Sequence, residues 1–364
     1  MIPNVITTQA ELETFVNKIS SSPWIAIDTE FMRESTYYPK LCLIQIATQE
    51  ICVCIDVIAL DNIDALINFI KQSAAIKIFH SARQDLEVLY CTYDFLPEPL
   101  FDSQIAASIL GMDEQISYAE LVSQELSITL PKSESRTNWS QRPLTEAQIK
   151  YALDDVLHLG PLALKLQQKL EAKQRWHWLT EECHRLLNPD NYSVAPEHAW
   201  KQVKGVGRLE GRSLYNVQQL ATWREQTAIT KNLPRRWIIK DQTMTDLAFN
   251  KTINENTVRD QLSQESPKSV RHTKKVLEIL EHAAAQKIND LEGIMDRRLS
   301  KPQQALVKDM MKTIRKHAEE IGTSSSLLAN RKSLVNLVLG LNSKVNEGWR
   351  HQEIGEQLSK MLNS

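Results

Sequence analysis

Several kinds of segment are missing from this 364-residue sequence, and each absence argues against a class of protein. No apolar run approaches the roughly 18 residues of a membrane span. The first residues also lack the basic stretch and apolar core of a secretory leader, so we expect neither feature. The motif G-x-x-x-x-G-K-S/T is absent, which argues against a helicase. The segment Gly205-Val206-Gly207, followed by Gly211, misses the dinucleotide-binding spacing by one residue.

Cysteines are few and do not form a framework. They make an odd set of five without C-x-x-C spacing: Cys42, Cys52, Cys54, Cys91 and Cys183. This pattern argues against both a disulfide scaffold and a zinc site. Buried, reduced thiols are typical of cytosolic proteins, and we therefore expect a cytoplasmic protein.

Charge is unevenly distributed along the chain, although the formal net charge is only −2. Residues 1–190 hold 26 Asp and Glu against 15 Lys and Arg, whereas residues 191–364 hold 19 acids and 28 bases. An acidic half can concentrate metal cations, and a basic half attracts a phosphate backbone. The asymmetry is a hint of nucleic-acid contact, although two ordinary domains with solvated surfaces would explain it equally.

The first 100 residues alternate short β-branched runs with helical patterns. Four strands are predicted, at Trp24–Ile27, Leu41–Ala47, Ile51–Ile55 and Ile76–Phe79. The second and third should pair as a hairpin, because only a short turn separates them. Apolar spacing predicts helices at 62–72 and from about 81 to 90. This order of elements implies an α/β domain with a mixed sheet.

From about residue 103 onward the pattern is helical. A helix over 146–171 is predicted from its start signal, because Thr145 with Gln148 three residues later is a capping box. The polar segment before it, 131–142, is predicted to be a loop. The composition changes at 188–191, which we interpret as a linker into two smaller helical units.

The strongest candidate site is Asp28-Thr29-Glu30, at the end of the first predicted strand. Residues i and i+2 of a strand share a face, so both carboxylates point the same way. Adjacent carboxylates repel each other unless a cation lies between them, and Mg²⁺ prefers carboxylate, water and phosphate oxygens. Two exposed acids in a turn are the alternative, which the apolar strand before them disfavours.

Further candidates follow along the chain. Asp85 lies near the start of the next helix, where it could also be an ordinary first-turn acid. Tyr151 and Asp155 are spaced i, i+4 and share one face of the capped helix. Asp154 points about 100° away from Asp155 and is predicted to face solvent or cap a neighbour. Asp102 is predicted to be a helix N-cap.

Taken in order, these residues resemble the DEDD exonuclease superfamily in its tyrosine-bearing branch, and within it the ribonuclease D family. The resemblance rests on four stretches: WIAIDTEFMRESTYYPKLCLIQIAT (24–48), IFHSARQDLEVL (78–89), LFDSQIAASILG (100–111) and WSQRPLTEAQIKYALDDVLHL (139–159). It implies a ribonuclease-H-like α/β catalytic domain at 1–190, with a mixed sheet flanked by helices.

The same resemblance implies a catalytic set. Asp28, Glu30, Asp85 and Asp155 would bind two divalent metal ions, Mg²⁺ or Mn²⁺, and Tyr151 would orient or help to deprotonate the attacking water. In two-metal phosphoryl transfer the ions stabilise the attacking and leaving oxygens. They would also neutralise the carboxylates beside an anionic phosphodiester. The implied products are nucleoside 5′-monophosphates and a shortened chain with a new 3′-OH.

The second half resembles the HRDC domain, a small helical nucleic-acid-binding module, in the stretch LATWREQTAITKNLPRRWIIKDQTMTDLA. The matching positions are Trp223, Arg224, Ala228, Pro234, Ile238, Asp241, Leu247 and Ala248. The resemblance implies one all-α HRDC-type domain at 195–290. A looser second copy is expected at 295–364, where LLANRKSLVNLVLG (327–340) carries the likeness.

Basic residues of this half are candidates for phosphate contacts that do not read sequence. They are Arg208, Arg212, Arg235, Arg236, Lys240 and Lys274, with Arg271 and Lys275 as further candidates. Each could instead be a solvated surface charge. Trp223 and Trp237 could stack on bases, although helical spacing favours packing in a core.

The sequence as a whole predicts a monomeric, metal-dependent 3′→5′ exoribonuclease with two helical modules that hold RNA. By resemblance, its substrates would be RNAs with a free 3′ end, such as tRNA precursors and other small structured RNAs, with no membrane partner. A DNA 3′→5′ exonuclease of the same superfamily would use the same residues, but the HRDC resemblance favours RNA. A catalytically inactive RNA-binding protein is disfavoured because every ligand position is filled.

Overall fold

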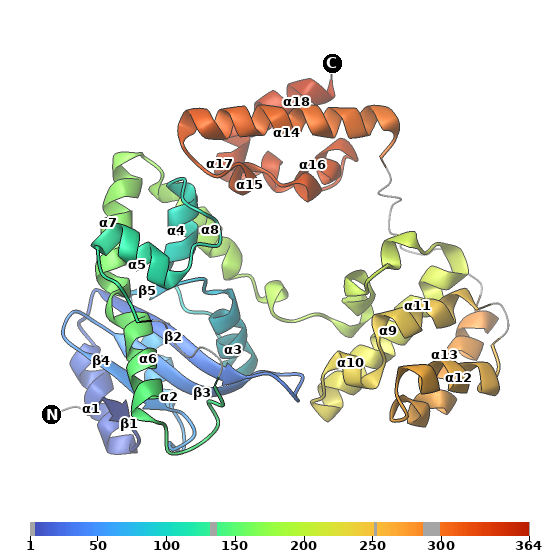
Figure 1. Ribbon diagram of the computed structural model, residues 1–364, viewed down its shortest axis with the longest axis horizontal. Coiled ribbons are helices and arrows are strands. Elements are labelled where there is room, and N and C mark those ends of the chain that lie inside the picture. The colour runs from blue at the N-terminus through green and yellow to red at the C-terminus, as the bar shows by residue number, and fades with distance from the viewer. Residues whose placement is uncertain (1–3, 132–136, 251–252, 287–298, 364) are drawn as a thin grey trace. The chain divides into compact units, whose positions relative to one another are not determined.

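The computed structural model describes residues 4–131, 137–250, 253–286 and 299–363. Contacts divide the chain into two compact units. Unit 1 comprises Met1–Met32, Lys40–Tyr192 and Leu299–Ser364, and unit 2 comprises Arg33–Pro39 and Ser193–Arg298. Each unit therefore combines segments that are far apart in the sequence, as their colours in Figure 1 indicate. Within the described ranges, no helix is both long and apolar enough to cross a membrane.

A six-stranded mixed sheet forms the centre of unit 1 (Figure 1). Its strands are β1 (Val5–Ile6), β2 (Trp24–Met32), β3 (Lys40–Ala47), β4 (Cys52–Asp56), β5 (Ile76–Phe79) and β6 (Leu100–Asp102). They lie in the order β1-β4-β3-β2-β5-β6. The β2–β3 and β3–β4 pairs are antiparallel, whereas the β1–β4, β2–β5 and β5–β6 pairs are parallel. The predicted hairpin and mixed sheet are therefore confirmed.

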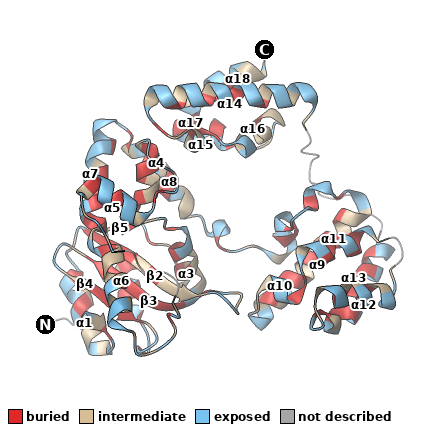
Figure 2. Cartoon of the chain, viewed as in Figure 1, coloured by how far each residue is buried: buried red, intermediate tan, exposed pale blue. Residues whose placement is uncertain are grey.

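Helices cover both faces of this sheet. They are α1 (Gln9–Ile19), α2 (Asp64–Gln72), α3 (Arg83–Tyr93), α4 (Ser103–Ile109), α5 (Tyr118–Leu126), α6 (Glu146–Leu157), α7 (Leu159–Ala172) and α8 (Trp176–Leu186). Helices α1, α2 and α3 share a hydrophobic cluster with Ile25 and Ile27 of β2, whereas α6 and α7 pack with Ala26. Figure 2 shows the buried residues concentrated in the strands and on the inner sides of the helices. Because strand side chains alternate, Asp28 and Glu30 point, like Ala26, toward α6.

Two predicted elements differ from the observed ones. Strand β2 continues to Met32, so Asp28 and Glu30 lie within the strand and not at its end. Pairing with the apolar strand β3 carries β2 onward, through a β-bulge between Glu30 and Phe31. The predicted helix 146–171 is two helices, α6 and α7. They separate because Pro161 has no N–H with which to continue the hydrogen-bond ladder of α6.

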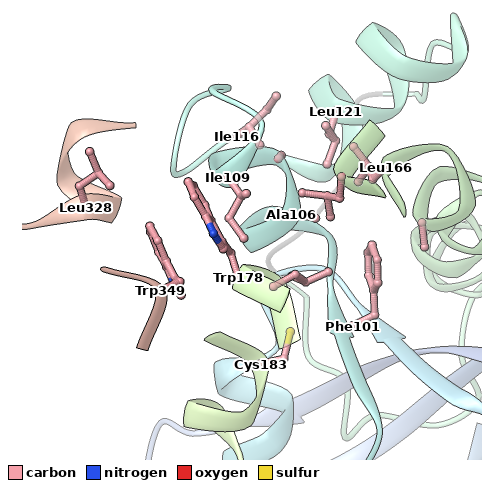
Figure 3. Packing of buried hydrophobic residues seen from close by; sticks show 14 of the residues in the cluster. Phe101, Ala106, Ile109, Ile116, Leu121, Leu166, Trp178, Cys183, Leu328 and Trp349 are labelled. Atoms are coloured by element: carbon pink, nitrogen blue, oxygen red, sulfur yellow. The ribbon is translucent and has the colours of Figure 1, made fainter. Parts of the chain in front are cut away.

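The last helices of the chain belong to unit 1: α14 (Lys301–Ile321), α15 (Ser325–Leu328), α16 (Arg331–Val338), α17 (Gly348–Arg350) and α18 (Glu356–Leu362). The ring of Trp349 stacks on Trp178 of α8, with centroids 4.1 Å apart and planes 12° from parallel (Figure 3). Beside this stack, the buried guanidinium of Arg350 donates to both carboxylate oxygens of the buried Glu182. Its Nε donates to the carbonyl of Leu327 at 2.8 Å. The C-terminal helices and α8 therefore share a hydrophobic core that contains the paired charges of Arg350 and Glu182.

Unit 2 contains helices and no strand within its described residues. Its helices include α9 (Gly211–Lys231), α10 (Arg235–Ile238), α11 (Asp241–Phe249), α12 (Glu255–Glu265) and α13 (Thr273–Ala285). The segment Arg33–Pro39, which connects β2 to β3, is also part of it. Tyr37 of this segment donates its hydroxyl to Glu225 of α9, which Arg235 contacts through Nε and Nη2 at 2.5 Å each. The fully buried carboxylate of Glu225 is thus compensated by Arg235.

Replacing Arg350 by alanine would leave the carboxylate of Glu182 buried without its cation. We expect the free energy of unfolding of unit 1 to fall by about 3–5 kcal/mol, as is typical when one partner of a buried pair is removed. Urea denaturation followed by tryptophan fluorescence measures this loss, because Trp178 and Trp349 lie in the same core. The matched control is Lys360→Ala, which removes an exposed cation from α18 and should cost less than about 0.5 kcal/mol. Equal losses in the two variants would contradict the prediction.

Candidate active site

Strand β2 presents Asp28 and Glu30 on the face of the sheet that α6 covers. Asp28, Glu30 and Asp155 each offer one carboxylate oxygen, and these three atoms lie within 4.8 Å of one another. Asp155 comes from α6, which packs against β2, β3 and β4. The i, i+2 spacing on the strand and the later helix thus bring three acids from distant segments to one place.

Helix α6 positions both Tyr151 and Asp155. Its start is held by the predicted capping box, in which the Gln148 N–H donates to Thr145 Oγ1 at 3.2 Å and the Thr145 N–H donates to Gln148 Oε1 at 2.9 Å. Tyr151 and Asp155 lie one helical turn apart and hydrogen-bond to each other. The ring of Tyr151 stacks on the buried Trp139, with centroids 6.0 Å apart. The phenol is therefore held between an aromatic neighbour and a carboxylate.

Asp85 reaches the cluster from the first turn of α3. Its Oδ1 accepts hydrogen bonds from the Thr29 hydroxyl at 2.6 Å and from the Thr29 N–H at 3.1 Å. Asp85 is not one of the three mutually close acids, but its charge contributes to the raised pKa of Asp28. Thr29 is a residue that sequence reasoning missed. Its position between Asp28 and Glu30 in the sequence could have indicated that it belongs to the site.

Burial raises the pKa of all four carboxyls, and repulsion from neighbouring acids adds to the effect. Burial, followed by the charge of Asp85, raises the pKa of Asp28 well above its usual range. Burial also raises the pKa of Glu30 to about 9, with Asp28 and Asp155 adding to the effect. It raises the pKa of Asp155 to about 8 and that of Asp85 to about 7. Within the described residues, no lysine or arginine is among the groups that shift these values.

The donor set fits hard divalent cations. Such ions take oxygen ligands, and carboxylates are their usual protein donors. Here three carboxylate oxygens can face a single cation, and a fourth carboxylate is held nearby by Thr29. Positive charge placed between them would relieve the repulsion that raises their pKa values.

A groove of about 620 Å³ adjoins the carboxylates. Tyr151 and Asp155 line it together with Tyr118, at the start of α5, and Lys150. Arg142 supports the segment that leads into α6, because its Nε and Nη2 pair with Asp56 at 2.6 and 2.7 Å. The same guanidinium donates to the carbonyl of Trp139 at 2.7 Å. The segment before α6, which forms one side of the groove, is therefore held in place by the Arg142–Asp56 ion pair.

Two polar residues near the cluster have structural partners of their own. Asp102 is the N-cap of α4, as predicted, and accepts from the backbone N–H groups of Gln104 and Ile105 at 2.9 and 3.2 Å. His80 lies 2.9 Å from Ser103 Oγ through Nδ1 and 3.1 Å from the Ile116 carbonyl through Nε2. Neither is one of the three close acids of the cluster.

The basic residues predicted in the second half fall into two groups. Arg212 donates to the carbonyls of Ala283 and Gln286, and Arg235 pairs with Glu225, so these two hold the fold of unit 2. The others, Arg208, Arg236, Lys240 and Lys274, are exposed. The two tryptophans differ in the same way. Trp223 packs edge-on against His272 with centroids 5.3 Å apart, whereas Trp237 is 47% exposed.

Comparison with known proteins agrees with this arrangement. A family model described as 3′-5′ exonuclease matches residues 3–171, and one described as HRDC domain matches residues 214–280. Similar proteins named ribonuclease D include one from Bartonella henselae, 34% identical over 98% of this chain and 89% of the relative. Another, from Sphingobium indicum, is 36% identical over 96% of this chain and 92% of the relative.

Among solved structures, the crystal structure of Escherichia coli RNase D, described as an exoribonuclease involved in structured RNA processing, matches with a TM-score of 0.92. The two chains are 29% identical, and the match covers 100% of this chain and 99% of that chain. The predicted α/β exonuclease domain followed by a helical HRDC region is thereby confirmed. Matched to such relatives over most of their length, the chain belongs to the ribonuclease D family and is a 3′→5′ exoribonuclease.

Proposed function

We propose that this exoribonuclease hydrolyses the 3′-terminal phosphodiester of RNA with Asp28, Glu30, Asp85, Tyr151 and Asp155, and that it uses two divalent ions, Mg²⁺ or Mn²⁺. The observation that carries the proposal is the convergence of three carboxylate oxygens within 4.8 Å of one another. Within the described residues, no cation is among the groups that shift the pKa values of these acids. Such a buried cluster is neutralised either by protons, as the raised pKa values indicate, or by bound cations, which would stabilise its ionised form.

Each protein group would have a distinct part in the reaction. Bound divalent ions would supply the positive charge that stabilises the attacking and leaving oxygens. Asp28, Glu30, Asp85 and Asp155 would hold those ions. Tyr151, held by Asp155 and Trp139, would orient the water that attacks phosphorus. As the new P–O bond forms, the P–O3′ bond breaks, so the terminal nucleoside leaves as its 5′-monophosphate and the shortened RNA keeps a 3′-OH.

The substrates proposed are tRNA precursors and other small structured RNAs with a free 3′ end. The groove beside Tyr151 and Asp155 would receive the single-stranded end. A catalytic domain at 1–190 would act with HRDC-type modules at 195–290 and 295–364, in a monomeric, cytoplasmic protein. The similarity to Escherichia coli RNase D, described as acting in structured RNA processing, supports this choice of substrate.

Asp155→Asn tests the catalytic set, because it keeps the size of the side chain and removes one charge. We expect release of nucleoside 5′-monophosphates from a 3′-extended tRNA in Mg²⁺ to fall by more than about 100-fold. The loss should exceed the roughly 10–100-fold effect of groups that only support a metal ligand. The matched control is Asp61→Asn, which removes the charge of an exposed carboxylate of unit 1 outside the close trio and should stay within about threefold of the unaltered protein.

Two further arms of this experiment test the metal and the substrate. Chelation with EDTA should abolish cleavage, and added Mg²⁺ or Mn²⁺ should restore it. Cleavage that persists in EDTA, or full activity of Asp155→Asn, would contradict the proposed mechanism. A single-stranded DNA of matched sequence should be degraded more slowly than the RNA. Faster degradation of the DNA would assign the enzyme to the DNA exonucleases of its superfamily.

Thr29→Val tests whether the hydroxyl that holds Asp85 matters for catalysis. Valine has the same shape but cannot donate to Asp85 Oδ1, so the carboxylate loses its 2.6 Å hydrogen bond and keeps its backbone hydrogen bonds. We expect kcat/KM to fall by about 10–100-fold and the Mg²⁺ concentration for half-maximal rate to rise. Thr29→Ser retains the hydroxyl and should recover most of the activity. Equal activity in the valine and serine variants would show that the hydroxyl has no positioning role.

A further inference from the structure

The groove beside the carboxylates contains a second tyrosine, Tyr118, which has no part in the reaction as proposed. It is the first residue of α5 and lines the groove together with Tyr151 and Asp155. Its ring packs against the hydrophobic core of unit 1 and lies beside the ring of His80, with centroids 5.7 Å apart. These contacts fix the place of its hydroxyl.

The hydroxyl of Tyr118 lies at the end of α6. Its oxygen accepts a hydrogen bond from the backbone N–H of His158 at 3.3 Å. His158 is the C-cap of α6 and follows Asp155 by three residues, which is less than one helical turn. The negative charges of Asp155 and Asp28 both act on this hydroxyl. Tyr118 therefore brings a phenol to the edge of the carboxylate cluster.

This phenol is a hydrogen-bond donor whose proton is free for a ligand. Burial raises the pKa of Tyr118 well above its usual value, and the charges of Asp155 and Asp28 add to the effect, so the phenol stays protonated at neutral pH. Its oxygen accepts from His158, but among the described residues its O–H donates to no acceptor. A substrate oxygen in the groove can provide that acceptor.

A neutral hydroxyl suits this position better than a phosphate oxygen. A phosphate at Tyr118 would add negative charge beside Asp155 and Asp28, which already repel each other. A ribose hydroxyl is both an acceptor and a donor, so it can accept from the phenol and donate to a neighbouring carboxylate. In RNA, each of the two sugars that flank the scissile phosphate carries a 2′-OH, which DNA lacks.

We infer that Tyr118 is a specificity-determining residue, whose hydroxyl donates a hydrogen bond to the 2′-OH of a ribose next to the scissile phosphate. The inference deepens the proposed function and rests on it, since it takes the cluster of Asp28, Glu30 and Asp155 as the place of cleavage. A site that pairs with a substrate hydroxyl discriminates against the analogue without it, because its own polar group is then left unpaired. Tyr118 thereby favours RNA over DNA within the catalytic groove.

The test compares three 5′-fluorescein-labelled oligoadenylates with Mg²⁺ and the full chain. One is all ribose, one has a 2′-deoxy sugar at the last nucleotide, and one has it at the next-to-last. Release of the first nucleotide gives kcat/KM. For the unaltered protein, we expect one of the two deoxy substitutions to lower kcat/KM by about three- to tenfold, as is typical of one hydrogen bond. The substrate that shows this loss identifies the ribose.

Tyr118→Phe removes the hydroxyl and keeps the ring beside His80, while the His158 N–H keeps its hydrogen bond to the Val156 carbonyl. On the all-ribose substrate, kcat/KM should fall by about three- to tenfold. On the sensitive deoxy substrate it should change by less than about twofold, because the hydrogen bond is already missing there. Effects of the sugar on the reactivity of the phosphate are the same in both proteins and cancel in this comparison.

A hydroxyl that only supported the end of α6 would act on all three substrates alike. Equal losses on the three substrates in Tyr118→Phe would therefore overturn the inference. So would an unaltered protein that does not distinguish any of them. The matched control is Tyr93→Phe, which removes a hydroxyl at the end of α3, outside the groove, and should leave all three values within about twofold. Circular dichroism should show both variants folded.

Asp155→Asn, measured on the same substrates, separates this inference from the proposed function. The proposed function predicts that Asp155→Asn loses release of the first nucleotide from all three. Full activity of Asp155→Asn would refute the proposed catalytic set. If Asp155→Asn is inactive but Tyr118→Phe loses activity equally on the three substrates, the catalytic set stands and only the assignment of Tyr118 is overturned.

Discussion

Asp28, Glu30, Asp85 and Asp155 meet where β2, α3 and α6 come together, and burial there raises the pKa of each carboxyl. Groups that repel one another at a dehydrated place separate unless the surrounding structure holds them. The fold of unit 1 can be understood as the set of contacts that prevents this separation. The repulsion between these carboxylates also explains why they suit a metal ion, because a cation bound there replaces repulsion with attraction.

The elements that carry Asp28, Glu30 and Asp155 are anchored by interactions outside the cluster. Ile25 and Ile27 fix β2 in the core beneath α1 and α2, on the face opposite to Asp28 and Glu30. The capping box starts α6, and the Arg142–Asp56 pair holds the segment before it. On α7, Gly160 lets the ring of Trp24 approach the helix, since a Cβ there would lie 2.0 Å from that ring. The acids are therefore placed by packing that does not depend on them.

Much of this arrangement could be predicted from local sequence patterns. The i, i+2 spacing of Asp28 and Glu30 and the capping box at Thr145 depend on a few neighbouring residues, and both appear as expected. The length of β2 could not be predicted, because its polar residues 28–30 become strand only by pairing with β3. The short strands β1 and β6, which make only a few pairs, were not predicted either.

Contacts between distant segments were also beyond local patterns. Glu182 and Arg350 are separated by 168 positions, and nothing in either neighbourhood indicates the other. The same holds for Thr29 and Asp85, 56 positions apart. Where the likeness to a known family implied a role for distant residues, as it did for the four acids, they could be predicted together. It implied no role for Thr29, although the stretch 24–48 contains this residue, so the contact was missed.

Composition predicted an acidic half and a basic half, but a count of charges does not separate structural charges from functional ones. In unit 1, Asp56, Glu125 and Glu182 are acids whose charge Arg142, Lys169 and Arg350 compensate. In unit 2, Glu225 and Asp241 engage Arg235 and Arg224 in the same way. Among the groups left after these pairs are set aside are the buried carboxylates around Asp28 in unit 1 and the exposed cations Lys204, Arg236 and Lys240 in unit 2.

These carboxylates and these cations have opposite charge. The carboxylates suit metal ions, and the cations suit the phosphates of a nucleic acid. Within the described residues, the cluster around Asp28 has no cationic partner among the groups that shift its pKa. Lys204, Arg236 and Lys240 likewise form no ion pair there. Anionic clusters recruit metal ions, and cationic clusters recruit phosphates. An enzyme that cleaves a polyanion with metal ions needs both, and it needs them apart, because mixed together they would neutralise each other.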